Sequence, residues 1–99
     1  MPDYELIINF SDIETEKLYL NGFSKKIPQH IQKIAIRKLD MIDAAETLND
    51  LKAPPSNRLE ALKSDLKGFY SIRINDQYRI VFIFKNGNAH DVYITDYHN

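Results

Sequence analysis

The sequence predicts an α+β fold in which two helices from the N-terminal half pack on one face of a small, mostly antiparallel twisted sheet, in the order β-α-α-β-β-β. Three observations predict it. A helical apolar repeat runs from about residue 28 to 47, three strand-like segments follow residue 68, and Asn86-Gly87 separates the last two as a tight turn. We expect residues 1–99 to form a single domain, because a chain of 99 residues holds one core.

The first two elements are a strand and a short helix. Residues 4–10 are rich in β-branched and aromatic side chains, which predicts a strand. Ser11 or Asp12 can cap the following helix, and Ser11 with Glu14 has the spacing of a capping box. We expect this helix to reach about residue 20 and Gly22 to end it.

The second helix is predicted over about 28–47, with Pro28 at its first position. Residues 49–57 are read as a connection because they contain Pro54-Pro55. Residues 58–68 are expected to be irregular or partly extended. The apolar stripe of the second helix recurs at three- and four-residue steps and comprises Ile31, Ile34, Ala35, Leu39, Ile42 and Ala45.

Three strands are predicted over 69–74, 78–84 and 89–97. A three-residue loop at 75–77 sets Arg73 directly across from Arg79, on a face shared with Ser71 and Val81. A two-residue loop would put the arginines on opposite faces and mix both, so the three-residue loop is favoured. The other face is then apolar throughout and carries Tyr70, Ile72, Ile74, Tyr78, Ile80 and Phe82.

The last strand is expected to alternate regularly. One side then carries His90, Val92, Ile94 and Asp96, and the other carries Asp91, Tyr93, Thr95 and Tyr97. His98 follows at the strand's end. We interpret His90, just past the turn, as structural or exposed.

The opposed arginines have two readings. Like charges directly across a sheet repel each other, and an anion held between the two guanidinium groups would relieve that repulsion. Alternatively, each arginine pairs with a nearby acid such as Asp76 or Asp91. The first reading favours a phosphate-binding function.

Composition limits the classes of function. The net charge of −1 argues against a generic nucleic-acid coating protein, although residues 25–38 are basic and 40–50 acidic. The basic run is either a solvated helix face or a stripe that approaches a polyanion. The chain has no cysteine, no metal-site spacing, no secretory signal and no apolar run that spans a membrane. We therefore expect a cytoplasmic protein without metal or cofactor.

Three segments carry a resemblance to a known family. Residues 57–65, 70–80 and 91–98 resemble the HigB-type toxins of the RelE/ParE superfamily, and weaker similarity extends over nearly the whole chain. The resemblance implies a RelE-like fold and a bacterial type II toxin–antitoxin module. Its partners would be a HigA-like helix-turn-helix antitoxin, the 70S ribosome and mRNA, with promoter DNA bound only through the antitoxin and no membrane involved.

The resemblance also implies the site. Arg73 and Arg79 fall where the superfamily has basic residues on its RNA-facing sheet surface, and Asp96, Tyr97 and His98 match the C-terminal catalytic signature. Glu60 stands where some members have a histidine, and a branch of the family carries glutamate there. We further assign RNA binding to three basic residues, Arg58, Lys63 and Lys67.

The activity implied is a ribosome-dependent, metal-independent mRNA endoribonuclease in which a ribose 2′-OH attacks the adjacent phosphate. The arginines would stabilise the transition state, and His98 or Glu60 would transfer protons. Tyr97 would stack on a base, and Asp96 would position His98 or read a base edge. Two alternatives remain: a gyrase-poisoning ParE-like toxin, and a decayed toxin that acts as antitoxin partner or corepressor.

Overall fold

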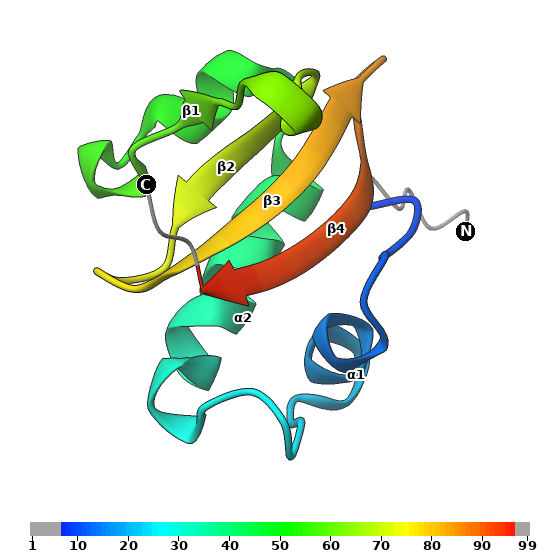
Figure 1. The fold of residues 1–99 in the computed structure, drawn as a ribbon, viewed down its shortest axis with the longest axis vertical. Coiled ribbons are helices and arrows are strands. Elements are labelled where there is room, and N and C mark those ends of the chain that lie inside the picture. Colours follow the sequence, from blue (N-terminus) through cyan, green and yellow to red (C-terminus); the bar gives the residue numbers. More distant parts are fainter. Residues whose placement is uncertain (1–6, 97–99) are drawn as a thin grey trace.

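The computed structural model describes residues 7–96 and contains an antiparallel four-stranded sheet in the order β1-β2-β3-β4 (Figure 1). Its strands are β1 (Glu60–Ala61), β2 (Phe69–Arg73), β3 (Tyr78–Lys85) and β4 (Asn88–Asp96). The three long strands lie where the sequence predicts them. The expected α+β class is confirmed.

Two helices pack against the sheet, α1 (Ile13–Asn21) and α2 (Gln29–Ala44). In Figure 1, α2 passes behind the sheet, and α1 lies beside the β4 edge, which it contacts. Within the described residues, neither helix is long and apolar enough to cross a membrane. The helices therefore close one face of the sheet, as predicted, and leave the other face for the candidate site.

The cap of α1 is Asp12 rather than Ser11. The Asp12 carboxylate accepts hydrogen bonds from the backbone N–H groups of Glu14 (3.3 Å) and Thr15 (3.2 Å). Ser11 instead donates its hydroxyl to the Asp91 carbonyl at 3.2 Å, so the Ser11–Glu14 capping box does not form. Gly22 ends the helix with φ of 79°, as predicted.

The second helix is shorter at both ends than predicted. Pro28 is its cap rather than its first residue, and the last helical residue is Ala44. The early end has a local cause: the backbone N–H groups of Glu46 and Thr47 donate to the Asp50 carboxylate, at 2.9 and 3.1 Å. These bonds start a 3-10 helix, η1 (Leu48–Lys52), in place of another turn of α2.

The segment between α2 and β2 is irregular, as predicted. After η1 it forms a second 3-10 helix, η2 (Pro55–Asn57), then the two-residue strand β1, then a third, η3 (Ser64–Leu66). This route lays β1 along β2, with Glu60 across from Ser71. Glu60 is thereby brought to the sheet face that the helices leave open.

The predicted hairpin register is confirmed. Arg73 pairs with Arg79, Ile72 with Ile80 and Tyr70 with Phe82. The second turn is also as expected, because Asn86 and Gly87 both have positive φ, 55° and 77°.

The regular alternation predicted for the last strand is wrong at its start. A β-bulge shifts the register between Val81 and Ile83, and Asp91 on β4 has φ of 53°. His90 therefore pairs with Ile83 on the open face, whereas Val92 lies on the helix-covered face. One extra residue in a strand reverses the sheet face on which the preceding side chains of that strand lie.

The predicted first strand is described only from residue 7 onward. Ile7 and Phe10 form isolated parallel bridges with Ala89 and Val92 of β4. The backbone N–H of Val92 donates to the Asn9 carbonyl at 3.2 Å, and further along the N–H of Ile94 donates to the Thr15 hydroxyl at 3.0 Å. These contacts cover the outer edge of β4, which would otherwise offer unpaired backbone groups.

The core lies between the helices and the sheet. The predicted stripe of α2 is buried, with Ile34 only partly so. The larger side chains that are fully removed from solvent in this layer are Leu18, Ile31, Leu39, Ile42, Ile72, Ile80, Phe82 and Val92.

Tyr19 of α1 packs against Phe10, with ring centroids 5.8 Å apart, and provides a test of this packing. Burial, followed by the charges of Asp43 and Asp40, raises the pKa of the Tyr19 phenol to about 12. The unfolded chain loses this proton near pH 10 and the folded chain near pH 12, so stability should fall across that interval. In Tyr19→Phe, the loss of unfolding free energy between these pH values should be smaller. Denaturant titrations of both proteins across this range measure it, and parallel curves would contradict the assignment.

Candidate active site

The candidate site occupies the open face of the sheet, where Arg73 and Arg79 lie across from each other on β2 and β3. This face is continued on β1 by Glu60 and on β4 by Thr95, which pairs with Arg79. Because directly opposed side chains share a face, the two cations and the carboxylate project from the same surface. The structure thus brings together three of the predicted site residues.

Arg79 is held in a fixed position. Its Nε donates to the Ser71 hydroxyl at 2.8 Å, and its Nη2 donates to the Arg58 carbonyl at 2.6 Å. The side chain is 12 % exposed. A guanidinium group anchored in this way keeps its orientation without a ligand, which is the form of electrostatic preorganisation that catalysis requires.

Glu60 stands next to Arg79. Its Oε1 lies 3.7 Å from Arg79 Nη2, and half of its side chain is exposed. Glu60 reaches this position because β1 pairs antiparallel with β2. A carboxylate that is open to solvent can exchange protons, and an adjacent fixed guanidinium group can stabilise an anion.

Arg73 is more exposed than Arg79 and pairs with Asp76 of the β2–β3 loop. Its Nε also donates to the Asn75 carbonyl at 3.0 Å. The reading in which each arginine pairs with an acid thus holds, but the partners are Asp76 and Glu60. Asp91 instead accepts a hydrogen bond from Asn9, at 2.6 Å. The Asp76 side chain is 94 % exposed, so its ion pair with Arg73 contributes little to stability.

The three residues assigned to RNA binding lie in the segment that leads into β2. Arg58 follows η2 with φ of 46° and presents its carbonyl to Arg79. Lys63 and Lys67 flank η3, at the end of the sheet where β2 begins, whereas Arg73 ends that strand. All three side chains are exposed, and Arg58 contacts Arg79 through its backbone carbonyl.

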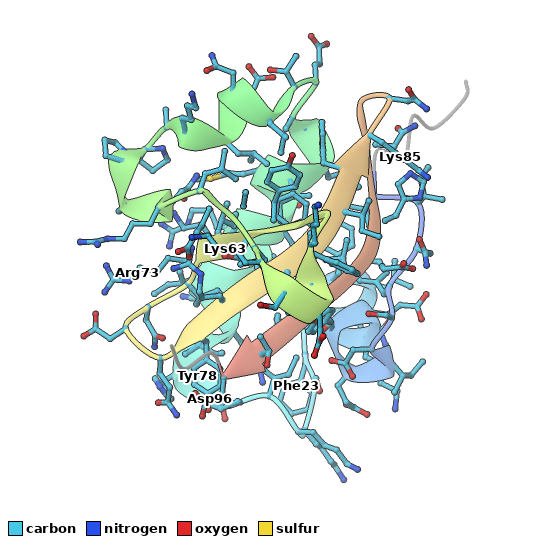
Figure 2. The ribbon with its side chains drawn as sticks, turned by 45° about the horizontal axis from the view of Figure 1, so that its top comes forward. Phe23, Lys63, Arg73, Tyr78, Lys85 and Asp96 are labelled. Carbon is cyan, nitrogen blue, oxygen red and sulfur yellow. The ribbon has the colours of Figure 1, made fainter. Side chains whose placement is uncertain are left out.

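Asp96 lies apart from the arginines. It pairs with Tyr78, which packs against the core, so the register places it on the helix-covered face; Figure 2 shows the two side by side. Its Oδ2 accepts from Gln77 Nε2 at 2.9 Å. It lines a hollow with Asp12, Glu14 and Lys26. The structure therefore does not bring Asp96 together with Arg73 and Arg79. Tyr97 and His98, also assigned to the site, lie outside the described residues.

A buried hydrogen bond between Lys38 and Asn57, next to the site in sequence, was not predicted. Asn57 is fully buried, and its side-chain carbonyl accepts a hydrogen bond from Lys38 Nζ of α2. Its amide donates to the carbonyls of Leu51 (3.1 Å) and Ala53 (3.3 Å). Burial, and then the charge of Arg37, lowers the pKa of Lys38. The only sequence signal for this contact is that Lys38 falls next to the apolar stripe of α2.

Tyr93 is a further residue of the open face that was not assigned to the site. It pairs with Val81 on β3, two residues along from Arg79. Burial raises the pKa of its phenol, so this aromatic group is neutral at physiological pH. A neutral phenol beside the arginine pair provides a surface on which a base can stack.

Comparison with known proteins places the chain in a family. Residues 8–98 match the model of the HigB-like toxins, described as the RelE-like toxin of the type II toxin–antitoxin system HigB. The chain is 39 % identical to Toxin HigB-1 of Vibrio cholerae, over 90 % of this chain and 95 % of that protein. It is 32 % identical to Endoribonuclease HigB of Proteus vulgaris, over 94 % of this chain and all of that protein.

A solved structure supports the same assignment. The YoeB-YefM complex from Staphylococcus aureus contains a chain that superposes with a TM-score of 0.54 at 28 % identity, covering 91 % of this chain and 93 % of that one. An uncharacterised protein of Haemophilus influenzae is 40 % identical over 87 % of this chain and 86 % of its own length. The chain belongs to the HigB-like family of RelE-like toxins of type II toxin–antitoxin systems.

Proposed function

We propose that this toxin is a ribosome-dependent endoribonuclease that cleaves mRNA and thereby stops translation and growth. The observation that carries the proposal is the fixed Arg79 guanidinium, opposite Arg73 and 3.7 Å from Glu60 on one open face. The name of the Proteus vulgaris relative, an endoribonuclease, supports the same class of reaction.

In the proposed reaction, a ribose 2′-oxygen attacks the adjacent phosphorus and the bond to the 5′-oxygen of the next nucleotide breaks. The products are a 2′,3′-cyclic phosphate and a free 5′-hydroxyl end. Arg79 and Arg73 stabilise the negative charge that develops on the phosphate oxygens. Glu60 accepts the 2′-OH proton, and His98 donates a proton to the leaving oxygen. Tyr97 stacks on a base next to the cleaved bond.

The low net charge of the chain supports the proposed dependence on the ribosome. The chain carries a net charge of −1, whereas proteins that bind RNA unaided rely on many cations to displace counterions. Arg58, which contacts Arg79, and Lys63 and Lys67, near the start of β2, add only local attraction. We propose that the ribosome positions the mRNA, and that an antitoxin of the HigA type, with a helix-turn-helix domain, binds and neutralises the free toxin. Promoter DNA is bound only through that antitoxin.

Mapping the 5′ ends of cellular mRNA after induction of the chain tests the function. We expect new 5′-hydroxyl ends within translated regions, at a constant phase relative to the codons. Double-strand DNA breaks without new RNA ends would replace the proposal with gyrase poisoning. Unchanged growth with neither lesion would indicate a decayed toxin. An uninduced culture of the same strain is the control.

A further inference from the structure

We propose that the outer side of α1, together with the loop after it, is the docking surface for an acidic, amphipathic segment of the antitoxin. We name it the Phe23 surface; the inference rests on the antitoxin partnership proposed above. It comprises three apolar and three basic side chains, Ile13, Lys17, Leu20, Phe23, Lys25 and Lys26.

Its apolar part is unusually exposed. Ile13 is 61 % exposed, Leu20 67 % and Phe23 51 %. Ile13 and Leu20 are seven residues apart on α1 and therefore lie on one side of the helix. Leu18, on the opposite side of α1, is fully buried. Lys17, four residues after Ile13 on the same side of α1, lines one hollow together with Phe23. Large exposed apolar side chains in one region are typical of a protein-binding surface.

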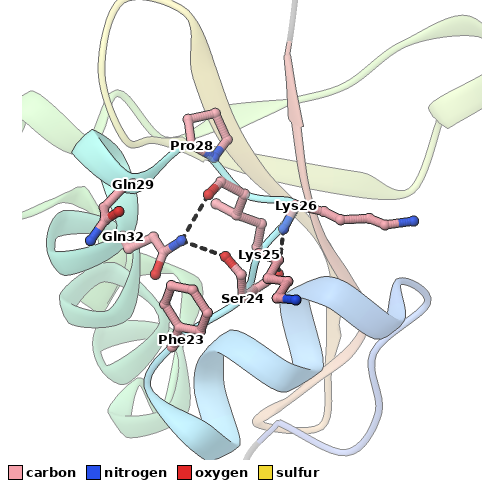
Figure 3. Close-up of a pocket in the computed structure, with 8 residues that line it drawn as sticks. Phe23, Ser24, Lys25, Lys26, Pro28, Gln29 and Gln32 are labelled. Atoms are coloured by element: carbon pink, nitrogen blue, oxygen red, sulfur yellow. Dashed lines mark hydrogen bonds between the residues drawn. The ribbon is translucent and has the colours of Figure 1, made fainter.

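The backbone under Phe23 is held rigidly, so the exposure of Phe23 does not come from a loose loop. Gln32 Nε2 donates to the carbonyls of Ser24 and Ile27, both at 2.7 Å (Figure 3). On the other side, the Ser24 hydroxyl donates to Glu14 Oε1 at 2.6 Å. The loop is thus joined to both helices, and a surface ordered before binding loses little entropy when a partner docks.

Phe23 lines two shallow hollows, with volumes of about 290 and 240 Å³. Lys25 and Lys26 line both of them, and Lys17 lines the second. They offer recesses into which apolar side chains of a partner can insert beside the aromatic ring.

The charge of the surface selects the partner. Residues 22–39 contain no acidic side chain, and within the described part of the chain neither Lys25 nor Lys26 forms an ion pair. The nearby carboxylate of Glu14 is already engaged by Ser24 and by Lys17, at 3.6 Å. Apolar side chains edged by lysines complement a helix or strand with an apolar face and acidic flanks.

Two other occupants fit less well. A second copy of this chain would place Lys25 and Lys26 against the same lysines, because a symmetric dimer uses one patch on both subunits. RNA would use the lysines and could stack on Phe23, but the aliphatic Ile13 and Leu20 offer no aromatic face to a base. The surface is also distinct from the face that carries Arg79.

The test measures binding of the purified full-length chain to the purified protein encoded by the gene beside it, by titration calorimetry and stopped-flow mixing. We expect Leu20→Ser with Phe23→Ser to raise the dissociation constant at least about tenfold. Lys25→Glu with Lys26→Glu should lower the association rate and its dependence on salt. The matched controls are Ile8→Ser, which changes another apolar side chain that is 52 % exposed, and Lys52→Glu with Lys85→Glu.

Unchanged affinity in both test variants, or equal losses in the controls, overturns the docking surface. Dimerisation of the wild type that Leu20→Ser with Phe23→Ser abolishes would assign the surface to a second copy instead. Loss of ribosome binding without loss of affinity for the neighbouring protein would assign it to RNA. If the wild-type chain does not bind that protein, the partnership itself fails. Because binding is measured without catalysis, the result does not depend on the ribonuclease proposal.

Discussion

Arg79→Ala should lower the rate of mRNA cleavage about 10²–10³-fold, the usual loss when one preorganised charge-stabilising group is removed. Arg79 donates to Ser71 and Arg58 and lies 3.7 Å from Glu60, so its guanidinium is fixed before substrate binds. Arg79→Lys keeps the charge but loses the planar fork, and we expect it to recover only part of the activity. Cleavage of ribosome-bound mRNA, followed by primer extension, measures both variants.

Arg37→Ala is the matched control, because it removes an exposed guanidinium from α2, on the other side of the sheet. Its cleavage rate should equal that of the wild type. Since Arg79 also contacts the Arg58 carbonyl, the melting temperature of Arg79→Ala is needed to separate lost chemistry from lost folding. Full cleavage by a folded Arg79→Ala protein would refute the site.

Asn57→Ala should reduce the free energy of unfolding by about 3 kcal/mol, because it leaves the buried ammonium of Lys38 without its acceptor and two backbone carbonyls without their donor. Lys38→Met should cost less, about 1 kcal/mol, since methionine keeps the apolar stem and removes the charge. In the Lys38→Met background, the cost of Asn57→Ala should shrink. Urea denaturation of the four proteins gives this coupling directly.

The rate of mRNA cleavage should also depend on the contact between Lys38 and Asn57. Asn57 precedes Arg58, whose carbonyl accepts from Arg79, so loosening this turn releases one of the bonds that orient the guanidinium. We expect Asn57→Ala to cleave more slowly even at a temperature where it is fully folded. Ser56→Ala, an exposed neighbour, is the control for both readouts. Additive stability effects for Lys38 and Asn57 would show that their contact contributes nothing.

The sequence by itself determined the features that depend on local periodicity. The stripe of α2 and the three-residue loop at 75–77 each depend on residues a few positions apart. A shift of one residue in that loop would have exposed an apolar face, so hydrophobic burial left a single register and with it the pairing of Arg73 with Arg79. The family resemblance rested on residues 57–65, 70–80 and 91–98, which include that loop.

Only the tertiary structure decided which groups meet across long separations. Arg79 meets residues 58, 60 and 71, and Lys38 meets Asn57 nineteen positions away. The bulge at Asp91 placed His90 on the open face, and the pairing with Tyr78 separated Asp96 from the arginines. Such contacts depend on how distant segments pack against one another. The spacing of a side chain along its own strand or helix predicts the face it lies on, but not the distant residue that it meets there.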